Sequence, residues 1–207
     1  MNRKTKLSAS MTVTQFENGY WYATELKEFA SSVGIPFANR LRKDELQEGI
    51  KLFLKTGKIQ SLTKRSFTIP STKDVDLGLR QDLPITRYTN DKETKAFLEH
   101  EAQKLAPGLK RKSGTRYRLN RWREAQLAQG LRITYGDLVR EYVRLNQTKG
   151  PFAQIPFDCY VNFLSDFLKA EKGATKEQAI KAWKELKTLD APKNYRSWKK
   201  FHSSKKK

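Results

Sequence analysis

The chain has 207 residues, of which 42 are Lys or Arg and 22 are Asp or Glu, so it carries a net charge of +20 at pH 7. This length suffices for one large domain or two small ones with their own cores. The single cysteine excludes an intrachain disulfide, and no apolar run reaches the roughly 18 residues of a membrane span. A lone cysteine is typical of a reducing compartment, so a cytoplasmic protein is expected. The basic excess predicts an acidic partner, with nucleic acid first.

Two helices separated by a short loop are predicted near the N-terminus. Residues 1–18 have a basic start with no apolar run behind it, which predicts a flexible N-terminus without a signal peptide. Apolar residues then recur at helical spacing through 24–33, and Gly34 and Pro36 predict the end of that helix. A second amphipathic helix is expected through 42–57, with a glycine at its end.

These two helices and their loop contain "ATELKEFASSVGIP" and "KDELQEGIKLFL": a leucine-bearing first helix, a Gly-aliphatic-Pro loop and a Lys-x-x-Leu second helix. Residues 19–58 therefore resemble a SAP domain of bacterial type, a nucleic-acid-binding helix, extended loop and helix related in shape to LEM domains. The following "FANRLR" departs from the family loop, which often has a small residue with Gly before its basic residue. The resemblance implies phosphate contacts near this loop.

Four polar residues at this loop and at the start of the second helix are candidate phosphate contacts: Asn39, Arg40, Arg42 and Lys43. A helix N-terminus adds exposed amide groups and a favourable dipole for phosphate, so these positions suit the chemistry. The alternative is an ordinary surface of mixed sign, because Lys43 is followed directly by Asp44 and Glu45.

The remainder of the chain predicts a linker and then a helical domain. Residues 59–88 contain two prolines and no helical period, which predicts a basic linker or extended arm with room for a short hairpin. Residues 89–201 predict the helical domain, and 202–207 a basic tail. Within that domain, alignment of Thr134 with Thr175 matches the apolar positions of two threonine-capped helices. This similarity has two explanations. The domain contains two related helix-turn-helix units, or the match is the pattern common to all amphipathic helices.

The segment "KRKSGTRYRLNRWR", residues 110–123, holds seven Lys or Arg and no acid. If it is extended, alternation places Tyr117 and Leu119 in the core, while Trp122 packs on the core or stacks on a base. Its cations then face solvent around a flexible loop and predict a phosphate grip: Lys110, Arg111, Lys112, Arg116, Arg118, Arg121 and Arg123. A solvated charged surface is the alternative. This half of the chain is also similar to an uncharacterised bacterial domain that follows SAP-like modules, which implies a fold and no activity.

The sequence thus predicts a mainly α protein that binds nucleic acid largely independently of base sequence, with DNA placed before RNA. Two alternatives remain: a protein-interaction module for an acidic partner, and a nucleic-acid-processing enzyme. No catalytic, metal or cofactor site is predicted, because His100 and His202 are far apart and acidic pairs such as Asp74 and Asp76 are typical of turns and caps. No particular oligomeric state is indicated.

Overall fold

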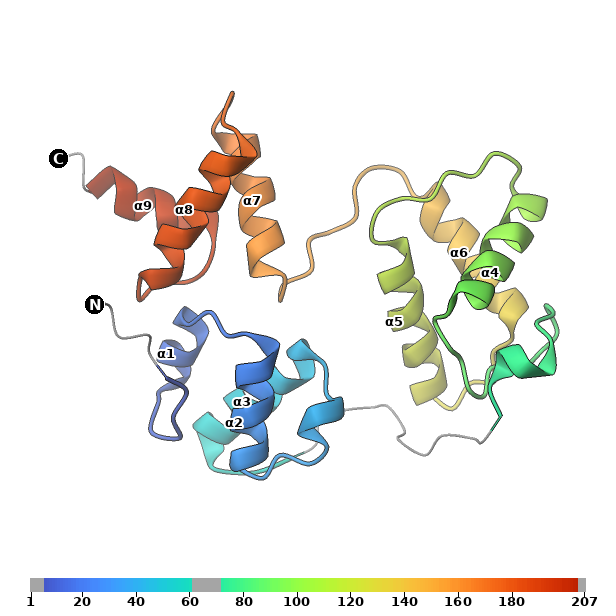
Figure 1. The fold of residues 1–207 in the computed structure, drawn as a ribbon, viewed down its shortest axis with the longest axis horizontal. Coiled ribbons are helices and arrows are strands. Elements are labelled where there is room, and N and C mark those ends of the chain that lie inside the picture. Colours follow the sequence, from blue (N-terminus) through green and yellow to red (C-terminus); the bar gives the residue numbers. More distant parts are fainter. Residues whose placement is uncertain (1–5, 61–71, 205–207) are drawn as a thin grey trace. The chain divides into compact units, whose positions relative to one another are not determined.

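The computed structural model describes residues 6–60 and 72–204, and these residues are mainly α-helical (Figure 1). Within them the chain forms nine α-helices, two short 3-10 helices and no β-strand, which confirms the mainly α fold. The chain divides into two compact units. The two-segment unit combines residues 6–60 with residues 153–204, and the central unit contains residues 72–152.

The first described helix, α1 (Val13–Asn18), is packed against the body of its unit. It begins at Thr12, whose hydroxyl accepts a hydrogen bond from the Gln15 N–H at 3.1 Å, while the Gln15 side chain accepts one from the Thr12 N–H at 2.9 Å. Phe16 is 2% exposed. The prediction of a flexible segment over 1–18 is therefore wrong for this helix, because a capping box and a buried aromatic hold it. The first five residues lie outside the described part.

The next two α-helices lie at the predicted positions: α2 is Ala23–Ser32 and α3 is Lys43–Thr56, with the 3-10 turn η1 at Ala38–Arg40 between them. Leu26 and Leu46 are both fully buried, one on each helix, where the two helices pack together. Gly34 has a φ of 86°, in the left-handed region, and this ends α2. The chain then turns back, and the Ile35 N–H donates to the Ala30 carbonyl at 2.8 Å.

The second segment of this unit forms α7 (Cys159–Ala170), α8 (Lys176–Thr188) and α9 (Tyr195–Ser204). Aromatic side chains dominate its core, and the Phe163 and Trp183 ring centroids are 5.4 Å apart. Tyr20, from the first segment, meets Trp183 edge to face at 5.0 Å. The predicted tail is wrong for its first three residues, which belong to α9, because the His202 ring stacks on Trp198 at 4.6 Å. The last three residues of the tail lie outside the described part.

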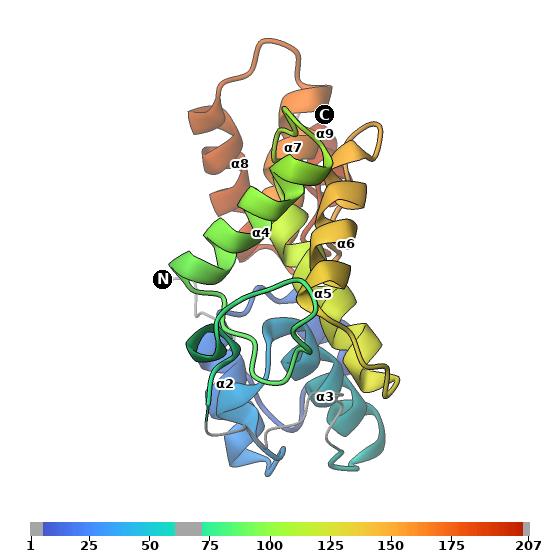
Figure 2. The same ribbon diagram turned by 90° about the vertical axis from the view of Figure 1, so that its right-hand side faces the viewer.

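The central unit contains a 3-10 turn and three α-helices: η2 (Asp74–Leu77), α4 (Lys92–Leu105), α5 (Thr115–Ala128) and α6 (Tyr135–Gln147). α6 packs against both α4 and α5, as the two views of the ribbon show (Figures 1 and 2). Tyr135, Leu138 and Val139 on α6 are at most 1% exposed. The core of the unit is therefore built around α6, and α5 covers one side of it.

Residues 72–88 contribute side chains to this core, although 59–88 was predicted to be a linker or an arm. Leu83 is 5% exposed and Ile85 is 7% exposed, and both belong to the core of the central unit. The Ile85 N–H donates to the Ile133 carbonyl at 2.9 Å, in an isolated antiparallel pairing with the residues before α6. The linker prediction is wrong here because these apolar side chains are buried by distant partners. The stretch between residues 60 and 72 lies outside the described part.

The two predicted threonine caps are confirmed. Thr134 accepts a hydrogen bond from the Asp137 N–H and Thr175 accepts one from the Gln178 N–H, each at 3.3 Å. The single helical domain predicted over 89–201 is instead divided, because α6 lies in the central unit and α8 in the two-segment unit. Each helix buries its apolar face in a separate core.

Candidate nucleic-acid interface

The basic segment, residues 110–123, is a short loop followed by the first part of α5, so the extended conformation considered for it is wrong. Thr115 and Leu119 are 0% and 2% exposed, at helical spacing, and half-buried Trp122 continues this face onto the core. Leu119 is therefore buried as predicted, and Trp122 packs on the core, the first of its two predicted alternatives. Tyr117 was predicted to be buried but is 40% exposed, because the helical period turns it away from Leu119.

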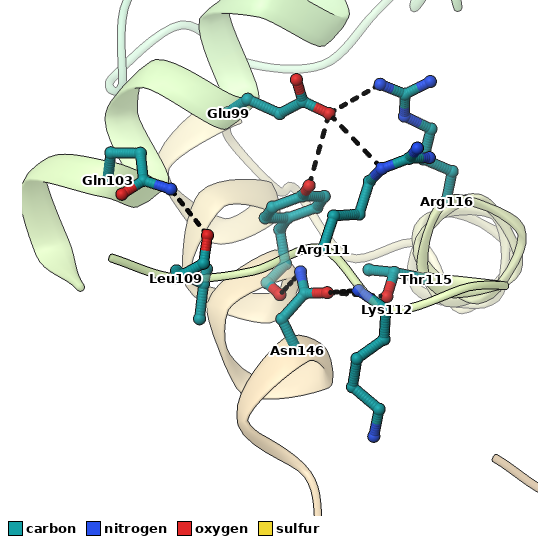
Figure 3. Close-up of polar contacts among 9 residues, drawn as sticks. Glu99, Gln103, Leu109, Arg111, Lys112, Thr115, Arg116 and Asn146 are labelled. Carbon is teal, nitrogen blue, oxygen red and sulfur yellow. Dashed lines mark hydrogen bonds and ion pairs between the residues drawn. The ribbon is translucent and has the colours of Figure 1, made fainter. Parts of the chain in front are cut away.

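The loop before α5 is fixed by hydrogen bonds to α6 (Figure 3). Asn146 Oδ1 accepts from the Lys112 N–H at 2.7 Å and from the Thr115 hydroxyl at 2.9 Å. The Asn146 Nδ2 group donates to the Tyr142 carbonyl at 2.8 Å. Gly114 has a φ of 82° immediately before the helix, a conformation that glycine adopts without strain. The "KRKSG" loop is thus held in one conformation near its end, and the prediction of a flexible loop is wrong there.

Lys112 points its charge at the end of α6. Its Nζ donates to the carbonyls of Thr148 and Gly150 at 2.6 and 2.8 Å, and it lies 4.3 Å from the centroid of the Phe152 ring. A cation at these carbonyls offsets the partial negative charge of the helix C-terminus. Lys112 was predicted to face solvent, but its ammonium group is occupied by these contacts.

Glu99 on α4 supplies the acid that the basic segment itself lacks. Its Oε1 lies 2.6 Å from Arg116 Nη2 and 3.9 Å from Arg111 Nε, and Figure 3 shows both side chains turned toward it. The Tyr142 hydroxyl donates to the same oxygen at 3.4 Å. Burial, together with this carboxylate, raises the pKa of Tyr142. The local charge is therefore lower than a count over 110–123 suggests.

Three further arginines of α5 lie over aromatic rings. The Arg118 guanidinium is 4.1 Å from the Phe152 ring centroid, and the Arg121 guanidinium is 5.7 Å from that of Tyr117. Arg123 is 3.8 Å from the Tyr88 centroid and its side chain is only 12% exposed. Arg123 was predicted to face solvent, which is wrong because Tyr88 covers it. Arg118 and Arg121 are half-buried and keep part of their surface in solvent.

The structure therefore divides the predicted grip into two groups. Lys112 and Arg123 act in packing and capping. The cations that remain accessible, fully or in part, form what we call the α5 basic surface: Lys110, Arg111, Arg116, Arg118 and Arg121. Exposed Tyr117 lies on the same helix. Lys110 forms no hydrogen bond or ion pair within the described residues, and both Lys110 and Arg111 are exposed.

The four candidates of the first segment lie at the turn before α3. Asn39 and Arg40 are exposed in η1, and Lys43 Nζ lies 4.8 Å from the centroid of the Tyr20 ring. The Arg42 N–H donates to Glu45 Oε2 at 2.8 Å. The first turn of α3 thus already carries its own carboxylates, which reduces its attraction for a phosphate.

Several cations that sequence reasoning did not single out are exposed on the last two helices: Lys181 and Lys184 on α8, and Arg196 and Lys200 on α9. The signal was the lysine spacing on the polar side of α8, opposite buried Ala182 and Trp183. Across residues 6–60 and 72–204, no three His, Cys, Asp or Glu side chains gather where they could hold a metal ion. None of the helices in these ranges has the length and apolar character needed to cross a membrane.

Comparisons with known proteins assign no family to this chain. No protein family, no characterised protein and no solved structure matches it.

Proposed function

We propose that this chain binds nucleic acid through phosphate contacts that depend little on base sequence, with DNA placed before RNA. The main support is α5, which carries four arginines and one glutamate in fourteen residues. Only Thr115 and Leu119 of this helix are fully buried, so most of its surface lies at or near the outside of the central unit. A cationic helix surface with an exposed aromatic suits a polyanion that also has stacking bases.

The contacts between arginines and aromatic rings are compatible with this role. A guanidinium group that lies over a ring still points its N–H donors outward in its own plane, where phosphate oxygens can accept from them. The ring also restrains the side chain, which reduces the entropy lost on binding. Arg118 and Arg121 lie over the Phe152 and Tyr117 rings, and Arg118 Nη1 also donates to the Gly114 carbonyl at 3.4 Å.

The turn before α3 offers a second, smaller basic surface, with Asn39 and Arg40 exposed. A SAP-like role for α2 and α3 fits this placement and is part of the proposal. Two modest surfaces on one chain raise the apparent affinity, because binding of the first increases the effective concentration of the second. Binding that rests on phosphates should weaken steeply with salt.

The test is fluorescence anisotropy of the full chain with labelled duplex DNA, single-stranded DNA and RNA over a range of salt. One variant replaces Lys110, Arg111, Arg118 and Arg121 with Gln. The matched control replaces four exposed cations elsewhere in the central unit: Lys73, Arg80, Lys92 and Lys149. Both variants lose the same net charge, so a difference between them reports a localised surface.

We expect the first variant to lower the slope of log affinity against log salt by about 0.9 for each lost duplex contact. The control should bind nearly as the natural chain does. Equal behaviour of the two variants would mean that net charge alone attracts the polyanion. Polyglutamate that competes as well as DNA would favour an acidic protein partner, and cleavage of the DNA or RNA with Mg²⁺ or Mn²⁺ would favour the enzyme.

A further inference from the structure

A groove lies in the two-segment unit, between α7, the loop after it, α8 and α9. Its volume is about 480 Å³, within the range of sites that hold small ligands. The residues on which its chemistry depends are Lys172, Lys181, Glu171, Glu185, Trp198 and His202. None of them belongs to the α5 basic surface, which lies in the other unit.

The two carboxylates of the groove are already engaged by neighbouring side chains. Glu171 Oε1 lies 3.3 Å from Lys199 Nζ and also accepts a hydrogen bond from the Tyr195 hydroxyl. Glu185 Oε2 accepts from Trp198 Nε1 at 3.4 Å and lies 3.8 Å from His202 Nδ1. Lys199 therefore offsets the charge of Glu171, whereas Glu185 accepts a hydrogen bond from a neutral indole and keeps its negative charge.

The two lysines are not compensated in this way. Lys172 and Lys181 are exposed, and neither forms an ion pair or hydrogen bond within residues 6–60 and 72–204. Two ammonium groups at the edge of one groove attract an anion and can donate up to three hydrogen bonds each. Lys172 lies in the loop after α7 and Lys181 lies on α8, so the two lysines belong to different elements of the groove.

The aromatic part of the groove can hold a flat ring. His202 stacks on Trp198 with ring centroids 4.6 Å apart and an angle of 25° between the planes. Trp198 is 9% exposed, while the His202 side chain is 42% exposed. His202 Nδ1 is buried, so the exposed part of this side chain is made of its other atoms. A planar ligand could continue the stack there.

A nucleotide combines a flat base with an anionic phosphate, and these two parts match the exposed imidazole and the two lysines of the groove. We propose that this groove binds one nucleotide unit of a single-stranded nucleic acid, with the base stacked on His202 and a neighbouring phosphate held by Lys172 and Lys181. This inference rests on the proposed function, and it adds a preference for single strands over duplex. A paired base lies inside the duplex stack and cannot reach a groove of this kind without being extruded.

The preference is tested by the ratio of affinities for single-stranded and duplex DNA of one sequence, measured by anisotropy at fixed salt. His202→Ala should lower single-strand affinity about 5- to 150-fold, the effect of losing one stacked base, and leave duplex affinity within about twofold. His202→Phe should retain most of the single-strand affinity, because it keeps a ring.

The lysines are tested by the same ratio of single-strand to duplex affinity. Lys181→Ser should lower this ratio. Lys184 is an exposed lysine of α8 outside the groove, so Lys184→Ser should leave the ratio unchanged.

A second measurement locates the ligand directly. Adenosine 5′-monophosphate is added to the ¹⁵N-labelled full chain, and the indole N–H resonances of its four tryptophans are followed by NMR. The Trp198 resonance should shift, while those of Trp21 and Trp122 should not, and His202→Ala should abolish the shift. Thermal unfolding of each variant shows that it is folded.

The outcomes separate this inference from the proposed function. If the chain binds both DNA forms, His202→Ala leaves the ratio unchanged and the Trp198 resonance does not move, the groove is not a nucleotide site and the proposed function stands. If the chain binds neither DNA nor RNA but the Trp198 shift is present and lost in His202→Ala, the proposed function and the single-strand preference both fail, and the groove is a site for free nucleotides. Absence of both polymer binding and the shift overturns both.

Discussion

Asn146 Oδ1 accepts a hydrogen bond from the Lys112 N–H at 2.7 Å, although the two residues are 34 positions apart in the chain. The same oxygen accepts from the fully buried Thr115 hydroxyl at 2.9 Å. One side chain on α6 therefore fixes both the end of the basic loop and the first residue of α5. The orientation of the α5 basic surface depends on this contact.

Replacing Asn146 with Ala should destabilise the central unit. The change leaves the Lys112 N–H and the Thr115 hydroxyl without their acceptor, and a buried polar group that loses its partner costs about 1–3 kcal/mol. Gln147→Ala is the control, because the neighbouring Gln147 is exposed and should change the free energy of unfolding by less than about 0.5 kcal/mol. Urea unfolding of both variants measures the difference. Equal stability of the two would show that Asn146 does not hold the loop.

Replacing Glu99 with Gln should strengthen nucleic-acid binding. Glu99 lies next to Arg111 and Arg116, and its neutralisation leaves both guanidinium groups available for phosphates. The salt slope should steepen by up to about 0.9 for each arginine that gains a contact. The effect on stability should stay below about 1 kcal/mol, because the pair is partly exposed. Glu93→Gln removes the same charge from the exposed first turn of α4, so binding gains of equal size would assign the effect to net charge.

Lys110 and Lys112 should behave oppositely despite being two positions apart. Lys112→Ala removes two hydrogen bonds to carbonyls after α6 and should lower stability by about 0.5–1.5 kcal/mol, with little change in the salt slope. Lys110→Ala should leave stability unchanged and lower the slope by about 0.9 if it contacts duplex DNA. Thermal unfolding measures the stability of the two variants, and anisotropy over a range of salt measures their slopes. A lower salt slope for Lys112→Ala would mean that Lys112 does contact nucleic acid.

Stability of the central unit should fall at high pH through Tyr135. Burial raises the pKa of the Tyr135 hydroxyl above its ordinary 10.0, and the nearby Asp74 carboxylate, which accepts its hydrogen bond at 3.2 Å, raises it further. Below pH 10.0 the folded and unfolded chains both hold this proton, so its contribution is fully present. Above that pH the unfolded chain releases the proton first, and the free energy of unfolding falls by up to about 1.4 kcal/mol per pH unit.

The comparison with Tyr135→Phe isolates this effect. The variant loses the hydrogen bond to Asp74 at every pH but has no proton to release, so the difference in unfolding free energy between the two proteins should narrow above about pH 10. Urea unfolding of both proteins at several pH values measures this difference in unfolding free energy. A difference that stays constant into this range would mean that Tyr135 titrates normally. Tyr88 and Tyr142, whose pKa values are also raised, are present in both proteins. Their titration therefore cancels in the difference in unfolding free energy.

Local sequence patterns determined where four of the described helices form in this protein. The apolar spacing around Leu26 and Leu46, and the caps at Thr134 and Thr175, were sufficient because a helix and its cap depend on residues three or four positions apart. Thr12 and Gln15 form a cap of the same kind, and this signal could have identified α1. The sum of the charges was also available from the sequence, and with it the expectation of an acidic partner.

Only the tertiary structure decided which cations are accessible and which segments share a core. Lys112, Arg116 and Arg123 meet their partners at positions 148, 99 and 88, and no local pattern indicates such distant contacts. Residues 72–88 lack a helical period, yet Leu83 and Ile85 are buried through pairing with the residues before α6. The physical reason is the same in each case: the helical period governs neighbours along the chain, whereas burial and ion pairing depend on which surfaces meet when the helices pack.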